Sequence, residues 1–531
     1  MKWLKTIVYI GILLSASLTL FACETPEDSI QDPVPTDPVG DPRVQNYYQV
    51  FVRSFADGNG DGIGDFIGLE NSLDYFVDLG IEALWLMPIH PSPSYHGYDV
   101  DDYYAVHEDY GTLADFESFL AAADEAGIDV IIDFVMNHSS DSHPWFEAFM
   151  AGDPEYQDYY RRIPASDDRV GQTGAWGQTI WHAAGENTYY AGVFGGYMPD
   201  LNWSNPDVVD EMVNVATYWL DKGVDGFRID AAIHLFSVNE LPAGTASLDE
   251  SLFQLEYFSF QVKAHDEDAF IVGEVWDTAS IYQAFYPAID SVFHFDYGNA
   301  VVNAVNQGFS RSYVDDVIDW HENALAQNAT AVQSPFLRNH DQNRLAGASE
   351  PGYPNIGQDL EGLKLAAEML LSVPGSPFIY YGEELGMAGE RAFAPPLWDA
   401  TVRTPFLWDD ERLTTWTVDD YDYVDTPNQA VARVDEQMDD PNSLYHTYRS
   451  MLHLRLDEPA LKYGDITAYE GNHPGLQGFY RSFEGETLLV LHNVSEEVQT
   501  AAVEGTYDVI YGTFEGDVPA RSTAILKVNH E

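Results

Sequence analysis

Three carboxylates stand at the ends of three separate apolar runs: Asp230 in GFRID, Glu274 in IVGEVW and Asp341 in FLRNHDQNR. Each run is short and rich in Val, Ile, Phe or Leu, which predicts a buried parallel strand. In a parallel barrel, the C-terminal ends of the strands carry the reacting groups. Two carboxyl groups about 5–5.5 Å apart can break a glycosidic bond with retention of configuration. The three acids therefore predict glycosidase chemistry rather than surface charges or helix caps.

The proton that such chemistry needs sets a further requirement. A general acid must keep its proton near neutral pH, so its pKa must be raised by burial or by neighbouring negative charge. Three carboxylates that face one pocket provide this repulsion. Arg228 lies two residues before Asp230 and therefore on the same face of its strand, where we expect it to keep Asp230 ionised.

The elements that must position these acids alternate between strand and helix patterns from Tyr48 onward. Eight strands separated by helices is the count of a (β/α)8 TIM barrel, whereas an open doubly wound sheet usually has fewer. The helical patterns include 113–126, 207–222 and 360–372. The expected strands are 49–55, 83–89, 129–137, 226–230, 270–276, 292–297, 334–340 and 377–382.

Two stretches depart from this alternation. The interval between 138 and 199 has little periodicity and is too long for a simple βα loop, so it predicts an inserted subdomain after strand three. Near the C-terminus, segments such as 476–483, 487–493 and 507–511 alternate between turn residues, which predicts a small antiparallel β domain. The expected organisation is barrel over 44–138, subdomain B over 139–197, barrel again over 198–456, and the β domain over 457–531.

The first 22 residues have the anatomy of an export signal. Two lysines precede an apolar stretch, and the segment ends LFAC at residues 20–23. This pattern predicts a signal peptide over 1–22 rather than a spanning helix. Its ending resembles a bacterial lipobox with Cys23 as the lipidated residue; a plain cleaved signal with an incidental cysteine is the alternative. Residues 23–43 are rich in Pro and acidic side chains, which predicts an extended tether.

The charge balance is extreme, because 24 Lys and Arg residues stand against 87 Asp and Glu residues, a formal net charge of −63. A polyanionic surface repels phosphate backbones and anionic headgroups, so nucleic acid is excluded as a partner and the substrate is expected to be neutral or cationic. The many acidic side chains repel one another, and salt screens this repulsion. The charge therefore indicates adaptation to a saline medium. An ordinary acidic extracellular protein is the alternative.

Six segments carry a family resemblance that covers the chain from about Tyr48 to its C-terminus. The chain resembles the α-amylase-type glycoside hydrolases, in a group intermediate between α-amylases and oligo-1,6-glucosidases. The resemblance implies a (β/α)8 barrel with a B subdomain after strand three and a C-terminal β-sandwich. The segments are DVIIDFVMNH (129–138), MPDLN (198–202), GVDGFRIDAAIH (223–234), IVGEVW (271–276), FLRNHDQNR (336–344) and, for the eighth strand, GSPFIYYGEELGM (375–387).

The resemblance also implies roles for the three acids. Asp230 is expected to be the nucleophile, Glu274 the general acid and base, and Asp341 the carboxylate that binds sugar hydroxyls and favours the distorted transition state. His138 and His340 resemble the family's histidines that form hydrogen bonds with the hydroxyls of the sugar in subsite −1.

Three further residues bear on specificity. Tyr98 in HGYDVDDY resembles the aromatic platform under that sugar, and Asp99 follows it. The RTP-x-x-W-D run around Arg403 resembles exo-acting members of the family, in which an Arg and the Asp of the GYD motif together hold the non-reducing end. Arg403 and Asp99 would then shorten the donor side of the cleft.

Calcium is the expected cofactor. Asp57, Asn59, Asp61 and Asp65 place oxygen ligands at alternate positions of a glycine-rich loop, with the Ile63 carbonyl between them. Hard oxygen ligands on a flexible backbone suit Ca²⁺, and the loop resembles the family's calcium loop after strand one. A surface loop built from Asx turns is the alternative.

A second calcium set is implied by the resemblance alone. Asn137, Asp200 and His234 match positions that hold calcium between the barrel and subdomain B in many α-amylases. Oligo-1,6-glucosidases typically lack that histidine, and this chain keeps it as His234. The Lys that usually precedes it in the family is replaced by Ile233. Asn137 and His234 simply bonding one another is the alternative.

The sequence thus predicts a secreted, retaining α-glucan hydrolase, most simply an α-amylase acting on starch and maltooligosaccharides. His234 and the MPDLN segment favour an α-amylase, whereas Arg403 with Asp99 favours an exo-acting α-glucosidase or oligo-1,6-glucosidase. A transglycosylase shares the catalytic set, because a sugar can intercept the intermediate in place of water. The three intact acids disfavour a non-catalytic glucan-binding lipoprotein.

The expected partners follow from these features. An α-glucan or maltooligosaccharide is the only predicted ligand besides calcium, and the chain is expected to be a monomer. It would touch a membrane only through lipid on Cys23. We expect an exported protein at the cell surface or facing the periplasm, or else one that is released outside the cell.

Overall fold

The computed structural model describes residues 40–174, 176–236, 248–350, 352–392, 397–408, 414, 425 and 427–529. The predicted signal peptide, Cys23 and most of the tether lie outside these residues. The compact unit begins at Gly40, before the predicted end of the tether. Arg43 forms a 2.8 Å ion pair with Asp290 of the barrel. In the described part of the chain, no helix is long and apolar enough to cross a membrane.

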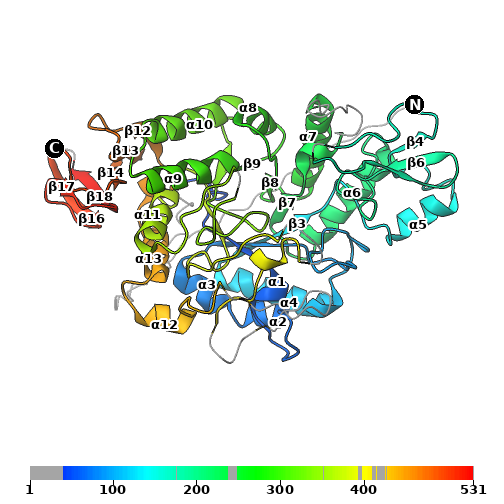
Figure 1. Ribbon diagram of the computed structural model, residues 1–531, viewed down its shortest axis with the longest axis horizontal. Coiled ribbons are helices and arrows are strands. Elements are labelled where there is room, and N and C mark those ends of the chain that lie inside the picture. Colours follow the sequence, from blue (N-terminus) through cyan, green and yellow to red (C-terminus); the bar gives the residue numbers. More distant parts are fainter. Residues whose placement is uncertain are drawn as a thin grey trace, which may run out of the picture. The chain divides into compact units, whose positions relative to one another are not determined.

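Eight parallel strands form the centre of this unit (Figure 1). Their order is β10-β9-β8-β7-β3-β2-β1-β11, and a parallel bridge between Phe336 and Phe378 joins the last strand to the first. The chain visits neighbouring strands in sequence, which confirms the predicted (β/α)8 barrel. The strands are β1 (Tyr47–Val50), β2 (Ala83–Leu86), β3 (Asp129–Phe134), β7 (Gly226–Ile229), β8 (Phe270–Gly273), β9 (Ser291–His294), β10 (Val332–Pro335) and β11 (Phe378–Tyr380).

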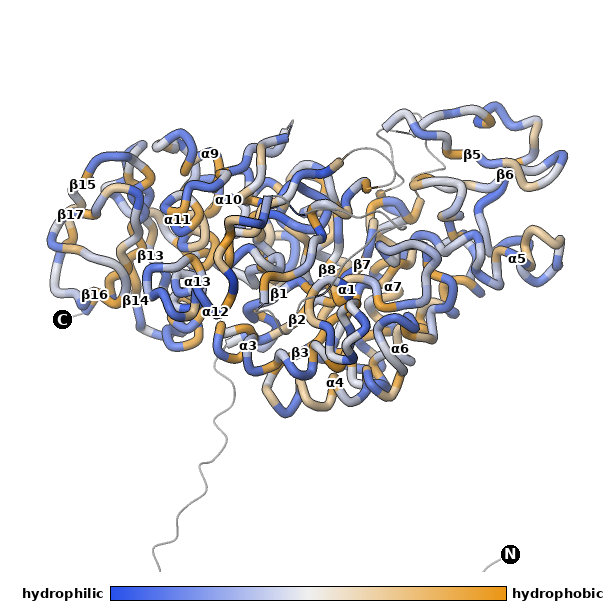
Figure 2. Tube along the Cα trace, turned by 60° about the horizontal axis from the view of Figure 1, so that its bottom comes forward, coloured by the Kyte–Doolittle hydropathy of each residue, from blue (hydrophilic) through white to orange (hydrophobic). Residues whose placement is uncertain are grey.

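Large side chains fill the barrel interior. Trp85 stacks on Phe293 with ring centroids 5.1 Å apart, and Tyr47 stacks on Phe378 at 4.4 Å. These residues belong to a buried cluster contributed by successive strands, as expected for inward-facing positions of a small barrel. A second, larger cluster lies between the strands and the surrounding helices. In Figure 2, hydrophobic segments accordingly concentrate in the interior and hydrophilic ones along the outer loops.

The helices that surround the barrel begin and end where local chemistry requires. Helix α4 is closed at its start by a reciprocal capping box between Thr112 and Asp115 and at its end by left-handed Gly127. The α-helices are α1 (Val52–Phe55), α2 (Phe66–Glu70), α3 (Leu73–Leu79), α4 (Leu113–Ala126), α5 (Pro144–Ala151), α6 (Pro206–Leu220), α7 (Leu248–His265), α8 (Ala279–Tyr282), α9 (Phe295–Gln307), α10 (Tyr313–Gln327), α11 (Leu360–Leu370), α12 (Val434–Asp439), α13 (Leu444–Asp457) and α14 (Pro459–Tyr463). Short 3₁₀ turns are η1 (Glu108–Tyr110), η2 (Ala232–His234), η4 (Gln283–Phe285) and η5 (Ala400–Val402).

Several strands end earlier than their apolar runs predict. The run over 49–55 changes to helix α1 after Phe51, and the run over 292–297 changes to helix α9 after His294. The ring of His294 accepts a hydrogen bond from the backbone N–H of Tyr297, and this cap starts the new helix. Strand β10 ends at Pro335, so the predicted strand residues 336–340 form a loop at the C-terminal end of the barrel.

The insertion between β3 and α6 contains a small sheet of its own. Strands β4 (Arg162–Pro164), β6 (Thr188–Ala191) and β5 (Trp181–Ala183) are antiparallel in the order β4-β6-β5. They pack around a separate apolar cluster that includes Ile180 and Val193. An isolated bridge between His138 and Asp200 joins the two ends of this insertion at the barrel.

The C-terminal part is antiparallel. A five-stranded sheet has the order β12-β13-β14-β18-β16, and a two-stranded sheet pairs β15 with β17. Arg481 of β13 donates to the carbonyl of Ser372 at 2.7 Å and thereby links the larger sheet to the segment after α11. The strands are β12 (Asp465–Ala468), β13 (Leu476–Phe483), β14 (Glu486–Asn493), β15 (Gln499–Thr500), β16 (Thr506–Tyr511), β17 (Asp517–Val518) and β18 (Ser522–Asn529).

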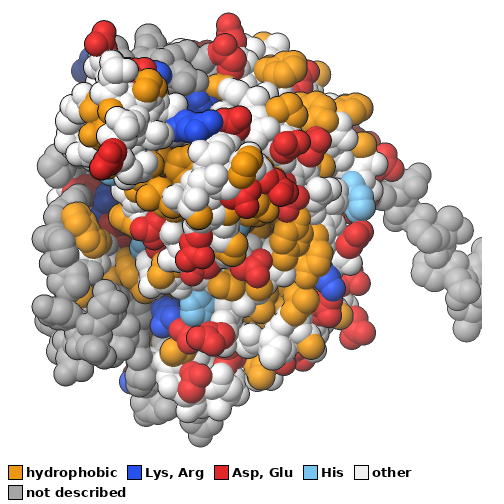
Figure 3. All heavy atoms as spheres, turned by 90° about the vertical axis from the view of Figure 1, so that its right-hand side faces the viewer, with side chains coloured by type: hydrophobic (Ala, Val, Ile, Leu, Met, Phe, Trp, Pro, Cys, Tyr) orange, Lys and Arg blue, Asp and Glu red, His pale blue; other side chains and the backbone are white. Residues whose placement is uncertain are grey.

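Acidic side chains are numerous on the face of the molecule drawn in Figure 3. On the face in Figure 3, Asp and Glu side chains are spread among exposed hydrophobic groups, whereas Lys and Arg are sparse. This distribution follows from the excess of acidic over basic residues in the composition.

Candidate active site

The three acids that the sequence singles out meet at the C-terminal end of the barrel. Asp230 directly follows β7, Glu274 directly follows β8, and Asp341 lies in the loop after β10. The first two are buried, and Asp341 is the most exposed of the three. The charge of Asp341 acts on the titration of both other acids, so the three form one electrostatic unit.

A single guanidinium group connects two of the acids. Arg228 Nη1 lies 2.7 Å from Asp230 Oδ1, and Arg228 Nη2 lies 2.8 Å from Glu274 Oε2. The sequence indicated that Arg228 faces Asp230, but not that it also holds Glu274. Nη1 makes a third contact, at 2.6 Å, with Asp133 Oδ1 near the C-terminal end of β3.

Asp133 is the main site residue that the sequence reasoning missed. Its side chain is fully buried, and it accepts hydrogen bonds from Arg228, from the Tyr98 hydroxyl at 3.1 Å and from Trp85 Nε1 at 3.3 Å. A signal was present, because an acid inside the apolar run DVIIDFVMNH needs a partner when it is buried. Asp133 of β3 lies directly opposite Arg228 of β7 and fixes its guanidinium, and Arg228 in turn contacts the two acids.

Burial and mutual repulsion set the proton affinity of the site. Burial raises the pKa of Glu274 to about 8; the charges of Asp230 and Asp341 add to the rise and Arg228 opposes it. Burial also raises the pKa of Asp230, and there too Arg228 opposes the rise. Glu274 therefore holds its proton through neutral pH, as a general acid must.

The backbone between the two acids is strained. Ala231 follows Asp230 with φ +49, a left-handed conformation that a residue with a Cβ rarely adopts. In this conformation its N–H donates to Glu274 Oε2 at 3.1 Å, and the N–H of Ala232 donates to the Glu274 carbonyl at 3.0 Å. The turn after β7 is thereby tied to Glu274.

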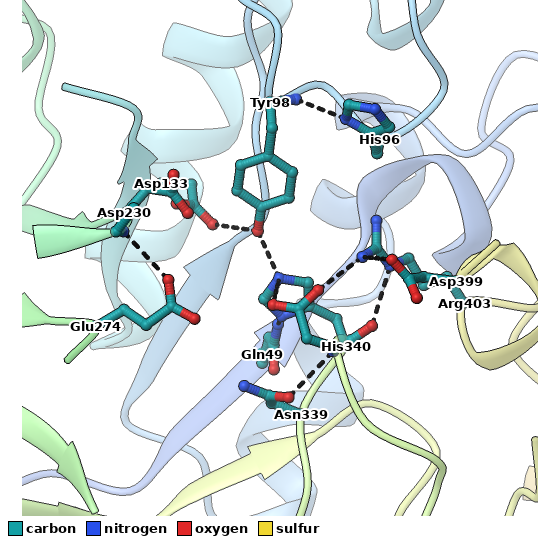
Figure 4. Close-up of polar contacts among 12 residues, drawn as sticks. Gln49, His96, Tyr98, Asp133, Asp230, Glu274, Asn339, His340, Asp399 and Arg403 are labelled. Atoms are coloured by element: carbon teal, nitrogen blue, oxygen red, sulfur yellow. Dashed lines mark hydrogen bonds and ion pairs between the residues drawn. The ribbon is translucent and has the colours of Figure 1, made fainter. Parts of the chain in front are cut away.

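A second network holds the aromatic floor of the site (Figure 4). Gln49 Nε2 lies 2.6 Å from His340 Nδ1, and His340 Nε2 lies 2.6 Å from the Tyr98 hydroxyl. Burial and nearby guanidinium groups lower the pKa of His340 well below its usual value, so the ring is neutral. When Gln49 donates to Nδ1, the single ring proton is on Nε2. Its N–H then donates to Tyr98, whose hydroxyl donates to Asp133.

Arg403 and Asp99, which were predicted to hold the non-reducing end together, have different partners within the protein. Its Nη2 lies 2.9 Å from Asp341 Oδ1 and 3.5 Å from Asp399 Oδ2, and its Nε donates to the His340 carbonyl at 3.1 Å. Asp99 instead accepts from the hydroxyls of Ser92 and Ser94. The predicted joint action of Arg403 and Asp99 therefore involves no ion pair between them. The acid next to Arg403, Asp399, was not foreseen.

His138 lies near this network and faces the insertion. Its Nε2 lies 3.1 Å from the carbonyl of Tyr98, the predicted platform residue, and its ring lies 5.2 Å from that of Phe194. Burial lowers the pKa of His138 to about 4, so it is neutral at physiological pH.

The two predicted calcium sets differ in their surroundings. In the described part of the chain, no group of three or more His, Cys, Asp or Glu side chains is arranged to hold a metal ion. Both predicted sets would therefore need amide or carbonyl oxygens as well. In the 57–65 loop, Asp57 accepts from the N–H groups of Gly60 and Gly62, and Asp65 caps helix α2 by accepting from Gly68.

The second set contains an unsatisfied oxygen. Asn137 Nδ2 donates to Asp200 Oδ1 at 3.4 Å, while Asp200 Oδ2 is buried without a hydrogen-bond partner. Burial raises the pKa of Asp200 to about 7. An orphaned buried carboxylate oxygen beside an amide fits a cation that prefers oxygen ligands.

Known proteins share this architecture over most of its length. The family model described as alpha amylase, catalytic domain, matches residues 49–464. Alpha-amylase 3 of Dictyoglomus thermophilum is 36% identical over 458 residues, 85% of this chain and 84% of that protein. A 4-alpha-glucanotransferase of Thermotoga maritima is 34% identical over 75% of this chain and 85% of its own length. An oligo-1,6-glucosidase of Parageobacillus thermoglucosidasius is 30% identical over 85% of this chain and 90% of its own length.

A solved structure agrees with the fold. The crystal structure of an alpha-amylase from H. orenii superposes with a TM-score of 0.81 at 34% identity and covers 92% of this chain and all of that one. Three acids at the C-terminal end of the barrel, the matching family model and these relatives lead to one conclusion. The chain belongs to the α-amylase family of glycoside hydrolases, in a group intermediate between α-amylases and oligo-1,6-glucosidases, and is an α-glucan-active enzyme.

Proposed function

We propose that this enzyme is an α-amylase that cleaves α-1,4-glucosidic bonds in starch and maltooligosaccharides through a covalent glycosyl-enzyme intermediate. The observation that carries the proposal is the shared guanidinium of Arg228, which contacts Asp230 at 2.7 Å and Glu274 at 2.8 Å. Two carboxyl groups held on one guanidinium suit the separation of about 5–5.5 Å that retention requires.

The chemistry proceeds in two displacements. Asp230 attacks the anomeric carbon while Glu274 gives its proton to the leaving oxygen, and the glycosyl ester on Asp230 forms. Glu274, now ionised, takes a proton from water, whose oxygen displaces Asp230. Asp341 binds sugar hydroxyls next to the reacting carbon, and Arg403 holds Asp341 in place. Tyr98, fixed by His340 and Asp133, supports the face of the sugar.

The alternative with an observation in its favour is an exo-acting α-glucosidase or oligo-1,6-glucosidase. Arg403, Asp341 and Asp399 form a charged cluster at one end of the site, which could bind the hydroxyls of a non-reducing end. A transglycosylase would use the same acids with a sugar hydroxyl in place of water.

Analysis of the early products distinguishes these activities. The substrates are maltoheptaose, soluble starch and isomaltose, each incubated separately with the enzyme. The proposed α-amylase releases a spread of intermediate lengths from starch and leaves isomaltose intact. Glucose released alone from chain ends, together with cleavage of isomaltose, would replace the proposal with the exo-acting enzyme. Products longer than the substrate would indicate transfer.

Calcium binding is part of the proposal. Asn137, Asp200 and His234 would hold one ion between barrel and insertion, and the orphaned Asp200 Oδ2 supports that site. The 57–65 loop would hold another with its alternate oxygens. Bound calcium would stabilise the native state by mass action. EDTA should therefore lower the melting temperature, restored calcium should recover it, and Asp200→Asn should reduce the response; a melting temperature unchanged after prolonged EDTA treatment would contradict both sites.

We also propose that the enzyme is exported, anchored by lipid at Cys23, and works as a monomer in a saline medium. The LFAC ending and the charge of −63 support these assignments. Radiolabelled palmitate incorporated into the parent but not into Cys23→Ser, expressed in a bacterial host, would support the anchor. Equal labelling of both proteins would contradict it.

A further inference from the structure

An exposed tryptophan stands on the insertion between β4 and β5. Trp176 is 64% exposed, although tryptophan is usually highly buried. Its backbone N–H donates to Gln178 Oε1 at 3.0 Å, and Gln178 Nε2 donates to the Val193 carbonyl at 3.0 Å. A bridge between Thr173 and Thr179 closes the turn. The exposed ring is therefore held by the backbone and is not a side chain on a loose strand end.

A continuous series of rings connects Trp176 with the active site. Its centroid lies 5.8 Å from that of Phe194 and 6.0 Å from that of His234. Phe194 lies 5.3 Å from His234 and 5.2 Å from His138, whose Nε2 contacts the Tyr98 carbonyl. Trp176 is thus the outermost member of an aromatic wall that begins beside the platform Tyr98.

The wall lies on the side of the site where the leaving group departs. His234 ends the short η2 turn that follows Ala231, and Ala231 and Ala232 both donate to Glu274. Glu274 protonates the leaving oxygen, so the sugars beyond the cleaved bond lie on its side. In Figure 4, Glu274 is on one side of the Tyr98–His340 pair, and Arg403 with Asp399 is on the other.

We propose that Trp176 is the stacking platform of an acceptor-side subsite that binds glucosyl units of the α-glucan beyond the scissile bond. This inference rests on the proposed function and adds the residue that recognises the leaving chain. A flat, rigid aromatic face matches the apolar face of a pyranose ring. A neutral sugar also suits a surface whose net charge of −63 disfavours anions.

The same subsite governs the second displacement. When a sugar occupies it, a hydroxyl oxygen of that sugar can attack the anomeric carbon, the bond to Asp230 breaks, and the hydroxyl proton passes to Glu274. When the subsite is empty, water makes the same attack and donates its proton to the same carboxylate. Trp176 therefore sets the ratio of transfer to hydrolysis as well as the binding of long substrates.

The test compares a substrate that reaches the subsite with one that does not. Maltoheptaose extends beyond the cleaved bond, whereas maltosyl fluoride has fluoride as its leaving group and places no sugar there. In Trp176→Ala, the ratio of kcat/KM for maltoheptaose to kcat/KM for maltosyl fluoride should fall about 2- to 13-fold, the range of an aromatic stacking contact. Transfer from maltosyl fluoride to added maltose should fall by a similar factor.

Two variants serve as controls. Trp176→Phe keeps an aromatic face and should retain most of the ratio. Phe253→Ala removes a ring of 65% exposure from α7, outside the aromatic wall, and should leave the ratio at the parent value. Equal losses on both substrates in Trp176→Ala, or an unchanged ratio, would overturn the inference. A parent enzyme that cleaves neither substrate would instead refute the proposed function.

Discussion

Replacing Arg403 with lysine tests how the third carboxylate is held in position. Arg403 contacts Asp341 Oδ1 at 2.9 Å through Nη2 and the His340 carbonyl at 3.1 Å through Nε. Lysine keeps the positive charge, but its single ammonium group cannot reproduce a planar guanidinium that reaches both acceptors. Arg403→Lys therefore removes one of these contacts and leaves either Asp341 Oδ1 or the His340 carbonyl without its donor.

The structure gives the magnitude of the loss. A hydrogen bond from a charged donor contributes about 1.5–3 kcal/mol. At 1.36 kcal/mol for each factor of ten in rate, kcat/KM should fall about 13- to 160-fold. The assay is the initial rate of maltotriose hydrolysis by Arg403→Lys and the parent, with thermal melting to verify that the variant is folded.

A neighbouring arginine provides the matched control. Arg391 Nε lies 2.5 Å from Asp399 Oδ1, the acid that also faces Arg403, whereas the contact with Asp341 comes from Arg403. Arg391→Lys should therefore lose much less activity. If Arg403→Lys remains within about 3-fold of the parent, or if Arg391→Lys is equally impaired, the account of Asp341 is refuted, because 3-fold is below about 0.7 kcal/mol.

Three further predictions follow from charge and burial. The kcat/KM of the parent should fall as the pH rises through about 8, where Glu274 loses its proton, and an alkaline limb near pH 5 would show that Glu274 is not the acid. Burial raises the pKa of Glu383 from 4.5 to about 8, so between these values the native state keeps a proton that the unfolded chain has lost, and this contribution makes stability fall with rising pH. Glu383→Gln should thus melt at a progressively higher temperature relative to the parent between pH 5 and pH 9, and a constant difference would contradict the linkage. The net charge of −63 predicts a melting temperature that rises toward roughly 1 M NaCl, as screening relieves repulsion; a flat or falling curve would count against adaptation to salt.

The barrel was predictable because its signals are local and repeated. Helix α4 has the predicted bounds, since Thr112 and Gly127 mark its ends in the sequence. The strand ends were less predictable. Apolar character continues past Val50 and His294, and only the three-dimensional position of the chain at the top of the barrel decides that helices begin there.

In the site too, the positions of residues along the chain were predictable, whereas their pairings were not. Acids at the ends of apolar runs identified Asp230, Glu274 and Asp341, because the position of a residue at the end of a parallel strand is fixed by the fold. Pairings across the site depend on side-chain directions, which a local sequence segment does not specify. The sequence therefore missed that Asp133 supports Arg228 and that Arg403 faces Asp341 and Asp399.

The most direct test of the central claim is the anomeric configuration of the first product. Proton NMR recorded within the first minutes of maltotriose hydrolysis, before mutarotation equilibrates the sugar, distinguishes the two anomers at the newly formed reducing end. Attack by Asp230 followed by attack of water predicts that the α-anomer appears first. Appearance of the β-anomer first would mean a single displacement by water and would contradict the assignment of Asp230 as the nucleophile.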